Sequence, residues 1–200
     1  FLPIATPFFP LLPPSLTALY FFGYHKIYPE HYPHHLDLAK PWTTPNLNDL
    51  QLSAFFFANS PSSVLIGALA SLSTSTPDLK TFYILGRIAR ASYAAKDIFP
   101  LLPRKLHTFS IVAEVHLTDD DFKHLPRKLT NLVVQHDGNA SYSPESLKSL
   151  PKSINSLVLP GLSAAHGPFL PPYIFAIYIS QFKWISVKHR FFNRLREKFG

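Results

Sequence analysis

The 200-residue chain contains no cysteine. This absence excludes disulfides, thiolate nucleophiles and zinc sites built on Cys, and it mildly favours an intracellular protein. Methionine is absent as well. Because the chain also begins with Phe1 inside a recurring pattern, we expect a fragment of a longer chain. No apolar run reaches the roughly 18 residues that a membrane-spanning helix needs, so we expect no such helix.

Glycine is scarce, with only seven residues in the chain. There is no Gly-rich phosphate-binding loop, no Gly-x-Ser-x-Gly and no His-Glu-x-x-His. Ser, His and Asp are plentiful, but none lies in a recognisable catalytic context. We therefore predict a protein that is not an enzyme and has no cofactor. Gly23, Gly86 and Gly161 follow predicted strands, where we expect turns with positive φ.

What the chain does contain is a recurring phrase, Leu-Pro-x-x-Leu-x-x-Leu-x-Leu. The strictest copies cover residues 102–111, 125–134 and 150–159, in steps of 23 and 25 residues. Further copies cover 12–21 and 170–179. In two looser copies, at 45–52 and 77–84, the Pro lies one residue closer to the first Leu. The first apolar positions of the seven copies are Leu16, Leu47, Leu79, Leu106, Leu129, Ile154 and Ile174.

This phrase resembles the leucine-rich repeat family over roughly residues 6–180. The resemblance implies an α/β solenoid, or horseshoe, of about seven repeats, with a parallel sheet on its concave side and short helices or irregular segments on its convex side. The family's usual Asn or Cys after the last Leu is missing, so we expect an irregular, twisted stack. The resemblance also implies recognition of a protein partner by the concave face.

Each copy predicts a short strand, because alternate residues of a strand face opposite sides. Leu106, Phe109 and Ile111 should point inward, and Thr108 and Ser110 outward. Parallel neighbours require crossover connections. Residues 60–72 form the best predicted helix, and shorter helices are expected at 119–125 and 144–150, with Phe122, Leu125, Leu147 and Leu150 facing the core.

The outward strand positions form two rows that are the first candidate site. Their residues are uncharged apart from Asp49 and partly aromatic, which is typical of a surface that buries against a partner. The alternative is a purely structural scaffold whose face packs on another domain. The rows comprise Tyr20, Gln51, Tyr83, Ser110, Val133, Val158 and Tyr178, and Ala18, Asp49, Thr81, Thr108, Asn131, Ser156 and Ala176.

The last twenty residues are basic, with a net charge of +5 from six Lys and Arg residues against Glu197. Phe191, Leu195 and Phe199 recur at helical spacing. We expect residues 181–200 to be a capping helix or tail closing the solenoid of residues 1–180. The alternative is binding to an anionic membrane surface or an acidic partner; no nucleic acid is expected. The basic residues are Lys183, Lys188, Arg190, Arg194, Arg196 and Lys198.

Two clusters of titratable residues contain groups of the kinds that bind metal ions. Glu30, His31, His34, His35 and Asp37 match no metal-binding spacing, and Pro29 and Pro33 break the helix that would align them, so we expect a solvated loop. The run of acids at 119–121 is expected to be the first turn of a helix. No metal site is predicted. The partner's identity, the oligomeric state and the compartment are left open by the sequence.

Overall fold

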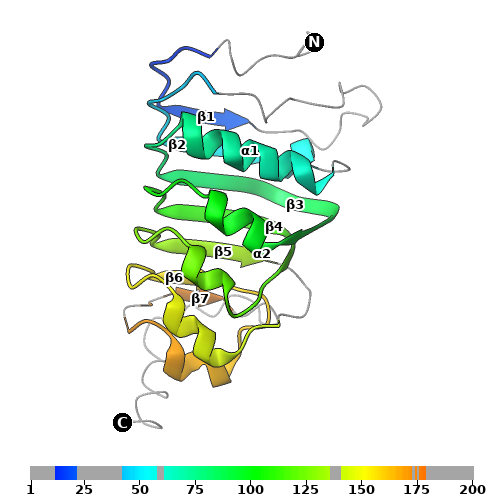
Figure 1. Cartoon of the computed structure of the whole chain (residues 1–200), viewed down its shortest axis with the longest axis vertical. Coiled ribbons are helices and arrows are strands. Elements are labelled where there is room, and N and C mark those ends of the chain that lie inside the picture. The colour runs from blue at the N-terminus through cyan, green and yellow to red at the C-terminus, as the bar shows by residue number, and fades with distance from the viewer. Residues whose placement is uncertain are drawn as a thin grey trace.

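The computed structural model describes residues 12–21, 42–57, 61–135, 141–172, 174 and 176–178. The fold is α/β, with seven strands that are all parallel and lie in the sheet in chain order (Figure 1). The strands are β1 (Ala18–Phe21), β2 (Asp49–Ser53), β3 (Thr81–Ala94), β4 (Thr108–His116), β5 (Asn131–Gln135), β6 (Ser156–Val158) and β7 (Ala176–Tyr178).

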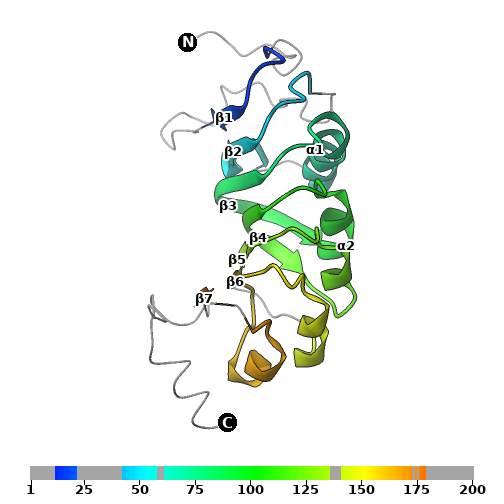
Figure 2. The ribbon, with the colours of Figure 1, turned by 90° about the vertical axis from the view of Figure 1, so that its left-hand side faces the viewer.

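The described parts of the connections between strands carry two α-helices and five short 3-10 helices. Figure 2 shows α1 and α2 on the same side of the sheet, as crossovers between parallel strands require. The α-helices are α1 (Ser62–Ser75) and α2 (Ala95–Ile98), and the 3-10 turns are η3 (Ala54–Phe57), η4 (Phe99–Leu101), η5 (Asp121–His124), η6 (Pro144–Ser149) and η7 (Ala164–Phe169).

The strands pair in the register that the recurring phrase predicts. Tyr20 pairs with Gln51, which pairs with Tyr83, and the same row continues across the sheet to Tyr178. The second row runs from Ala18 to Ala176 in the same way. A slip of one residue would turn every apolar side chain away from the core. The alternation of apolar residues in the phrase therefore fixes this register.

A tight turn precedes every strand. The backbone N–H of the first apolar residue in each copy donates to the carbonyl three residues earlier, over 3.0–3.2 Å. That carbonyl belongs to Pro in the stricter copies and to Thr44 and Thr76 in the two looser ones. In the looser copies Pro45 and Pro77 take the second turn position, where their fixed φ is favourable. The displaced prolines thus preserve the same turn.

The turns are joined to one another by a ladder of backbone hydrogen bonds. The carbonyl of Lys80 accepts from the N–H groups of His107 and Thr108, at 2.7 and 3.0 Å. The carbonyl of His107 accepts in the same way from Thr130 and Asn131. Thr17, Asn48 and Thr130 repeat the arrangement. This ladder of backbone groups holds successive copies in register.

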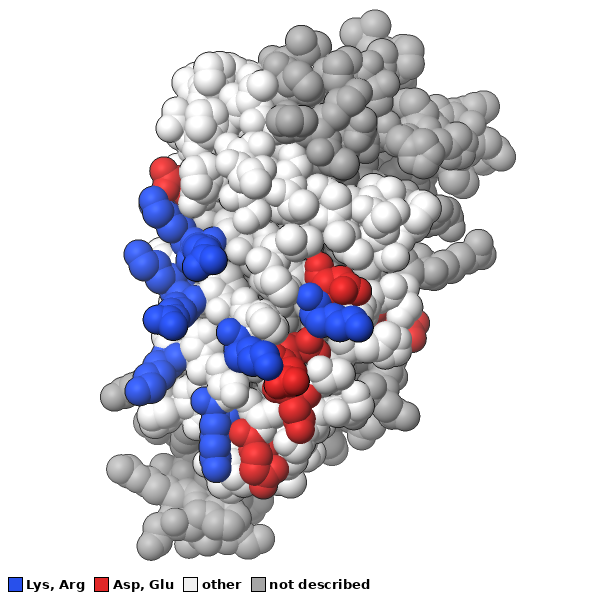
Figure 3. Space-filling model, viewed as in Figure 1, with Lys and Arg blue, Asp and Glu red and all other residues white. Residues whose placement is uncertain are grey.

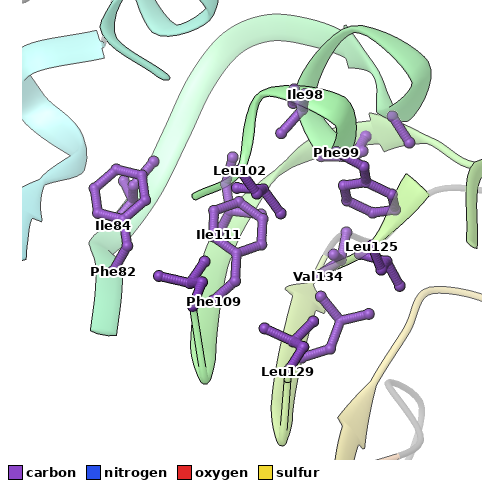
Figure 4. Packing of buried hydrophobic residues seen from close by; sticks show 14 of the residues in the cluster. Phe82, Ile84, Ile98, Phe99, Leu102, Phe109, Ile111, Leu125, Leu129 and Val134 are labelled. Carbon is purple, nitrogen blue, oxygen red and sulfur yellow. The ribbon is translucent and has the colours of Figure 1, made fainter. Parts of the chain in front are cut away.

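The core lies between the sheet and the helices. Leu106, Phe109 and Ile111 are completely buried, as predicted, and the ring centroids of Phe82 and Phe109 are 6.0 Å apart. Figure 4 shows Ile98, Phe99 and Leu102 covering the side chains that β3, β4 and β5 direct toward them. Burial of this apolar surface is the main force that stabilises the stack.

Two strands are longer than the short strands that the phrase predicts. β3 has 14 residues and β4 has nine. Gly86 lies inside β3 with φ of +91°, and the pairing with β4 shifts register on either side of Arg87. Gly86 therefore forms a bulge in a strand, although its positive φ, like that of Gly161 at +72°, was predicted.

The predicted helices are only partly present. α1 overlaps residues 60–72 and ends where Thr76 Oγ1 donates to the Leu72 carbonyl over 2.7 Å. The segments 119–125 and 144–150 are short 3-10 turns rather than α-helices. Their connections are too short for a longer helix before Pro126 and Pro151 restrict the backbone. Phe122, Leu125, Leu147 and Leu150 are nevertheless buried as expected.

Each carboxylate in the acidic run 119–121 has its own partner. Asp119 accepts from the backbone N–H and the hydroxyl of Ser143, at 2.5 and 3.0 Å, and so links η6 to the preceding copy. Asp120 pairs with Lys123 over 2.8 Å, which lowers the pKa of Asp120. Asp121 is buried and accepts from Thr118. The run therefore orders the chain locally.

We expect different changes in the free energy of unfolding when two buried tyrosines are each replaced by Phe. Tyr93 is 2% exposed, and its hydroxyl has no hydrogen-bond partner among the described residues. The Tyr142 hydroxyl donates to the Pro160 carbonyl over 2.8 Å. At pH 7 we expect Tyr93→Phe to leave the free energy of unfolding unchanged or higher, and Tyr142→Phe to lower it by about 1 kcal/mol. Urea unfolding measures both, and an equal loss in the two variants would contradict the assignment.

Tyr93 also predicts a loss of stability in alkali. Burial raises its pKa from 10.0 to about 12. The folded chain therefore holds the phenol proton of Tyr93 more tightly than the unfolded chain does. The contribution of this proton to the free energy of unfolding is complete below pH 10 and is lost as the pH rises through 12. Between pH 7 and pH 11, wild type should lose about 1 kcal/mol more than Tyr93→Phe. Equal losses on urea unfolding at both pH values would argue against a desolvated phenol.

Candidate functional site: the open face of the sheet

The side of the sheet opposite α1 and α2 is formed by alternate strand residues, and we name it the open face (Figure 2). Because the strands pair in register, chemically equivalent positions of successive copies lie side by side on it. Its described side chains are Ala18, Tyr20, Asp49, Gln51, Thr81, Tyr83, Thr108, Ser110, Asn131, Val133, Ser156 and Val158.

Accessibility differs along the rows. Tyr20 is 48% exposed, and Gln51, Tyr83 and Val133 are half-buried. Thr108 and Val158 are buried, at 8% and 7% exposure, although both were predicted to be available to a partner. The outward side of a strand does not guarantee exposure, since neighbouring side chains in the sheet also cover it. The accessible part of the open face therefore lies mainly on β1–β5.

Two hydrogen bonds between neighbouring strands fix polar side chains on the open face. The Tyr20 hydroxyl donates to Asp49 Oδ2 over 2.7 Å, and the pKa of Tyr20 is raised by this bond, by burial and by the Asp49 charge. Asn131 Nδ2 donates to Thr108 Oγ1 over 3.1 Å. Asp49 is the single charged residue of the two rows, and the phenol partly satisfies it. The rows thus present a surface of low charge.

The long β4 strand adds residues that the sequence reasoning missed. Val112, Glu114 and His116 lie on the same side of β4 as Ser110, because alternate residues share a face. The signal was available, since apolar residues recur at every second position from Ile111 to Leu117. Glu114 and His116 give the open face a polar margin at the carboxyl end of β4.

Ser92, His116 and Glu114 bring a hydroxyl, an imidazole and a carboxylate together at this margin. Ser92 Oγ lies 2.8 Å from His116 Nε2, and Glu114 Oε1 lies 3.6 Å from the same nitrogen. A nucleophilic triad needs the acid on the opposite ring nitrogen, where it orients the base. Both groups here meet Nε2, and all three residues are exposed. The cluster therefore has the residue types of a triad without its geometry.

Several predicted site residues lie outside the described part of the chain. These include the basic residues at 183–198 and the side chains of Ala176 and Tyr178, although the backbone of β7 is described. The His cluster at 30–37, for which we expect a solvated loop, also lies outside the described residues. Within the described ranges, no group of three His, Cys, Asp or Glu residues could hold a metal ion. None of the described helices is long and apolar enough to cross a membrane.

No protein-family model, curated protein or solved structure matches this chain. Its function is therefore inferred from its own residues. On the open face, the sequence pattern and the strand register place equivalent side chains together across consecutive strands.

Proposed function

We propose that the chain is a leucine-rich-repeat solenoid whose open, concave face recognises a protein partner without catalysis. The observation that carries this proposal is the alignment of equivalent residues in rows across consecutive strands. Such rows form one continuous surface, on which contacts from several copies add together.

The repeat assignment is supported by the way the copies stack. Each copy contributes one strand, preceded by the same turn, and each strand pairs with the strands of its neighbours in the sequence. A single copy cannot bury its apolar face alone, whereas stacked copies share a continuous core. The residues that would be exposed in an isolated copy, such as Leu79, Leu106 and Leu129, are completely buried here.

The binding assignment is supported by the chemistry and size of the open face. Interface centres are depleted in charge and enriched in tyrosine. The rows contain Tyr20, Tyr83 and Val133, and Asp49 is their only charged residue. Five strand steps from β1 to β6 span about 24 Å at roughly 4.8 Å per step. One partner of a standard interface buries about 800 Å². The width of the open face is close to the edge length of a square patch of that area.

A photo-crosslinking experiment locates the binding surface directly. A photoreactive amino acid would replace Tyr83 on the open face or, as the matched control, exposed Lys96 on α2. The proposal predicts a discrete protein adduct from position 83 that excess unlabelled chain suppresses, and none from position 96. Adducts from position 96 alone, or from both positions equally, would contradict recognition by the open face.

Side-chain truncation measures how much the open face contributes to the affinity for the partner. Once the adduct identifies the partner, Tyr20→Ser combined with Tyr83→Ser and Val133→Ser should weaken its binding by at least about tenfold, because buried aromatic contacts dominate interface energies. Binding is measured by calorimetry, and circular dichroism shows whether the variant is folded. A folded triple variant with unchanged affinity would sink the proposal.

A further inference from the structure

The turns before the strands collect positive charge. Arg104 and Lys105 occupy the two central positions of one turn, and Arg127 and Lys128 occupy those of the next. In the turn of the following copy, Lys152 occupies the position that corresponds to Arg104 and Arg127. Since the copies stack, side chains at equivalent positions start from backbones about 5 Å apart. Figure 3 shows the Lys and Arg side chains gathered along the left-hand edge, where the turns of Figure 1 lie.

Only part of this charge is neutralised within the described residues. Lys105 pairs with Asp78 of the preceding turn, and this contact lowers the pKa of Asp78. Lys123 pairs with Asp120 over 2.8 Å. Arg104, Arg127 and Lys128 form no ion pair with any described residue. Uncompensated like charges repel one another, which favours the binding of an anion.

The unpaired side chains surround a surface pocket of about 660 Å³. Its basic lining consists of Arg104, Lys123, Arg127 and Lys128, together with the ring of His124, and no Asp or Glu lines it. The η4 segment and the end of η5 add an apolar part through Leu102 and Leu125 with neighbouring prolines. This volume and this mixture of apolar and charged groups suit a small molecule.

The backbone that carries the arginines is held in place. The Ser153 hydroxyl lies 2.9 Å from the Arg127 carbonyl and 2.6 Å from the Leu129 carbonyl, and so links that turn to the next copy. The Arg104 turn is closed by the N–H of Leu106 donating to the Pro103 carbonyl over 3.0 Å. Fixed backbones bring two guanidinium groups to one pocket, and guanidinium binds phosphate through paired hydrogen bonds.

We infer that this pocket binds a small organic anion with two or more adjacent phosphate groups. Arg104, Arg127 and Lys128 contact the phosphates, and the exposed Pro100 in the pocket lining contacts the organic part. Three unpaired cations match a chain of phosphates better than a single one. The pocket is lined by the turns before β4 and β5 and by the η4 and η5 segments. It is therefore separate from the open face. The inference therefore does not depend on the proposed protein partner.

Calorimetric titration with tripolyphosphate and with adenosine triphosphate, at fixed ionic strength, tests this inference. Both should bind wild type, and inorganic phosphate should bind at least about tenfold more weakly. The double variant Arg104→Gln/Arg127→Gln should weaken tripolyphosphate binding at least about tenfold, as expected for losing charge-assisted hydrogen bonds. The control Lys80→Gln/Lys96→Gln removes the same charge from exposed residues outside the pocket lining, and should change binding little.

Three results would overturn the inference. Equal weakening in the two double variants would reveal only long-range attraction, and equal affinity for phosphate and tripolyphosphate would exclude a polyphosphate site. Binding to vesicles containing phosphoinositides, without binding of either soluble polyphosphate, would assign the pocket to a lipid surface. Thermal unfolding of each variant shows that the fold is retained. Because Gln keeps the aliphatic stems and both arginines are exposed, the variants should remain folded.

Discussion

Phe109→Ala should lower the free energy of unfolding by about 3–5 kcal/mol, which is the typical effect of truncating a buried Phe. Phe109 is fully buried in the middle of the stack and packs against Phe82 in the neighbouring strand. The change removes apolar contact and leaves a cavity between the sheet and the α2–η4 side (Figure 4). Urea unfolding followed by circular dichroism measures the loss.

Ser110→Ala is the matched control for this prediction. Ser110 follows Phe109 in β4 but lies on the open face, half-buried and outside the core. Its truncation should change the free energy of unfolding by less than about 0.5 kcal/mol, as is usual for surface substitutions. If Phe109→Ala were as mild as Ser110→Ala, the predicted alternation of inward and outward residues in β4 would be wrong.

Asp121→Ala should lower the free energy of unfolding by about 2 kcal/mol. Asp121 is 2% exposed, and its Oδ2 atom accepts from the backbone N–H and the hydroxyl of Thr118, at 2.6 and 2.8 Å. Hydrogen bonds to a charged acceptor are stronger than neutral ones. Losing both should loosen the start of η5, which carries the buried Phe122. Urea unfolding at pH 7 measures the effect.

The neighbouring Asp120→Ala variant separates this role from a general effect of acidic charge. Asp120 makes only a surface pair with Lys123 at 2.8 Å, and such pairs contribute little to stability. It should therefore unfold at nearly the same urea concentration as wild type. Comparable losses in the two variants would mean that the net charge of the run, rather than the Thr118 contacts, stabilises this turn.

The sheet could be predicted from the sequence because its determinants are local and recur in every copy. Each copy has the same spacing between its first apolar residue and its strand, so aligning the copies predicts the pairing of Tyr20 with Gln51 and of Val133 with Val158. Period-2 alternation also predicts which residues are inward, as with Phe109 and Ile111. These features require no knowledge of distant contacts.

The structure of the segments that connect the strands was harder to predict, because these segments differ in length and their conformation depends on how they pack against one another. Capping residues at 118 and 143 predict helices, but the short connections allow only 3-10 turns. Asp119 bonds to Ser143 of the next copy, a contact that local pattern cannot reveal. Burial of Val158 on the open face likewise depends on neighbouring side chains.

The basic pocket is hidden in the sequence for a different reason. The net charge outside the tail is small, and this average conceals a local concentration of one sign. The repeated Pro-Arg-Lys at 103–105 and 126–128 does indicate it, since equivalent positions of stacked copies must lie side by side. The sequence does not reveal that Lys105 pairs with Asp78, whereas Lys128 forms no ion pair with a described residue.

The central claim is that the copies stack side by side in chain order and thereby build the open face. Because the chain lacks cysteine, two cysteines can be introduced and spin-labelled without background labelling. From a label at Val133, the distances to labels at Tyr83, Gln51 and Tyr20 should increase by about 5 Å per strand step. Equal distances, or a label at Tyr20 nearer to Val133 than one at Tyr83, would contradict the stack.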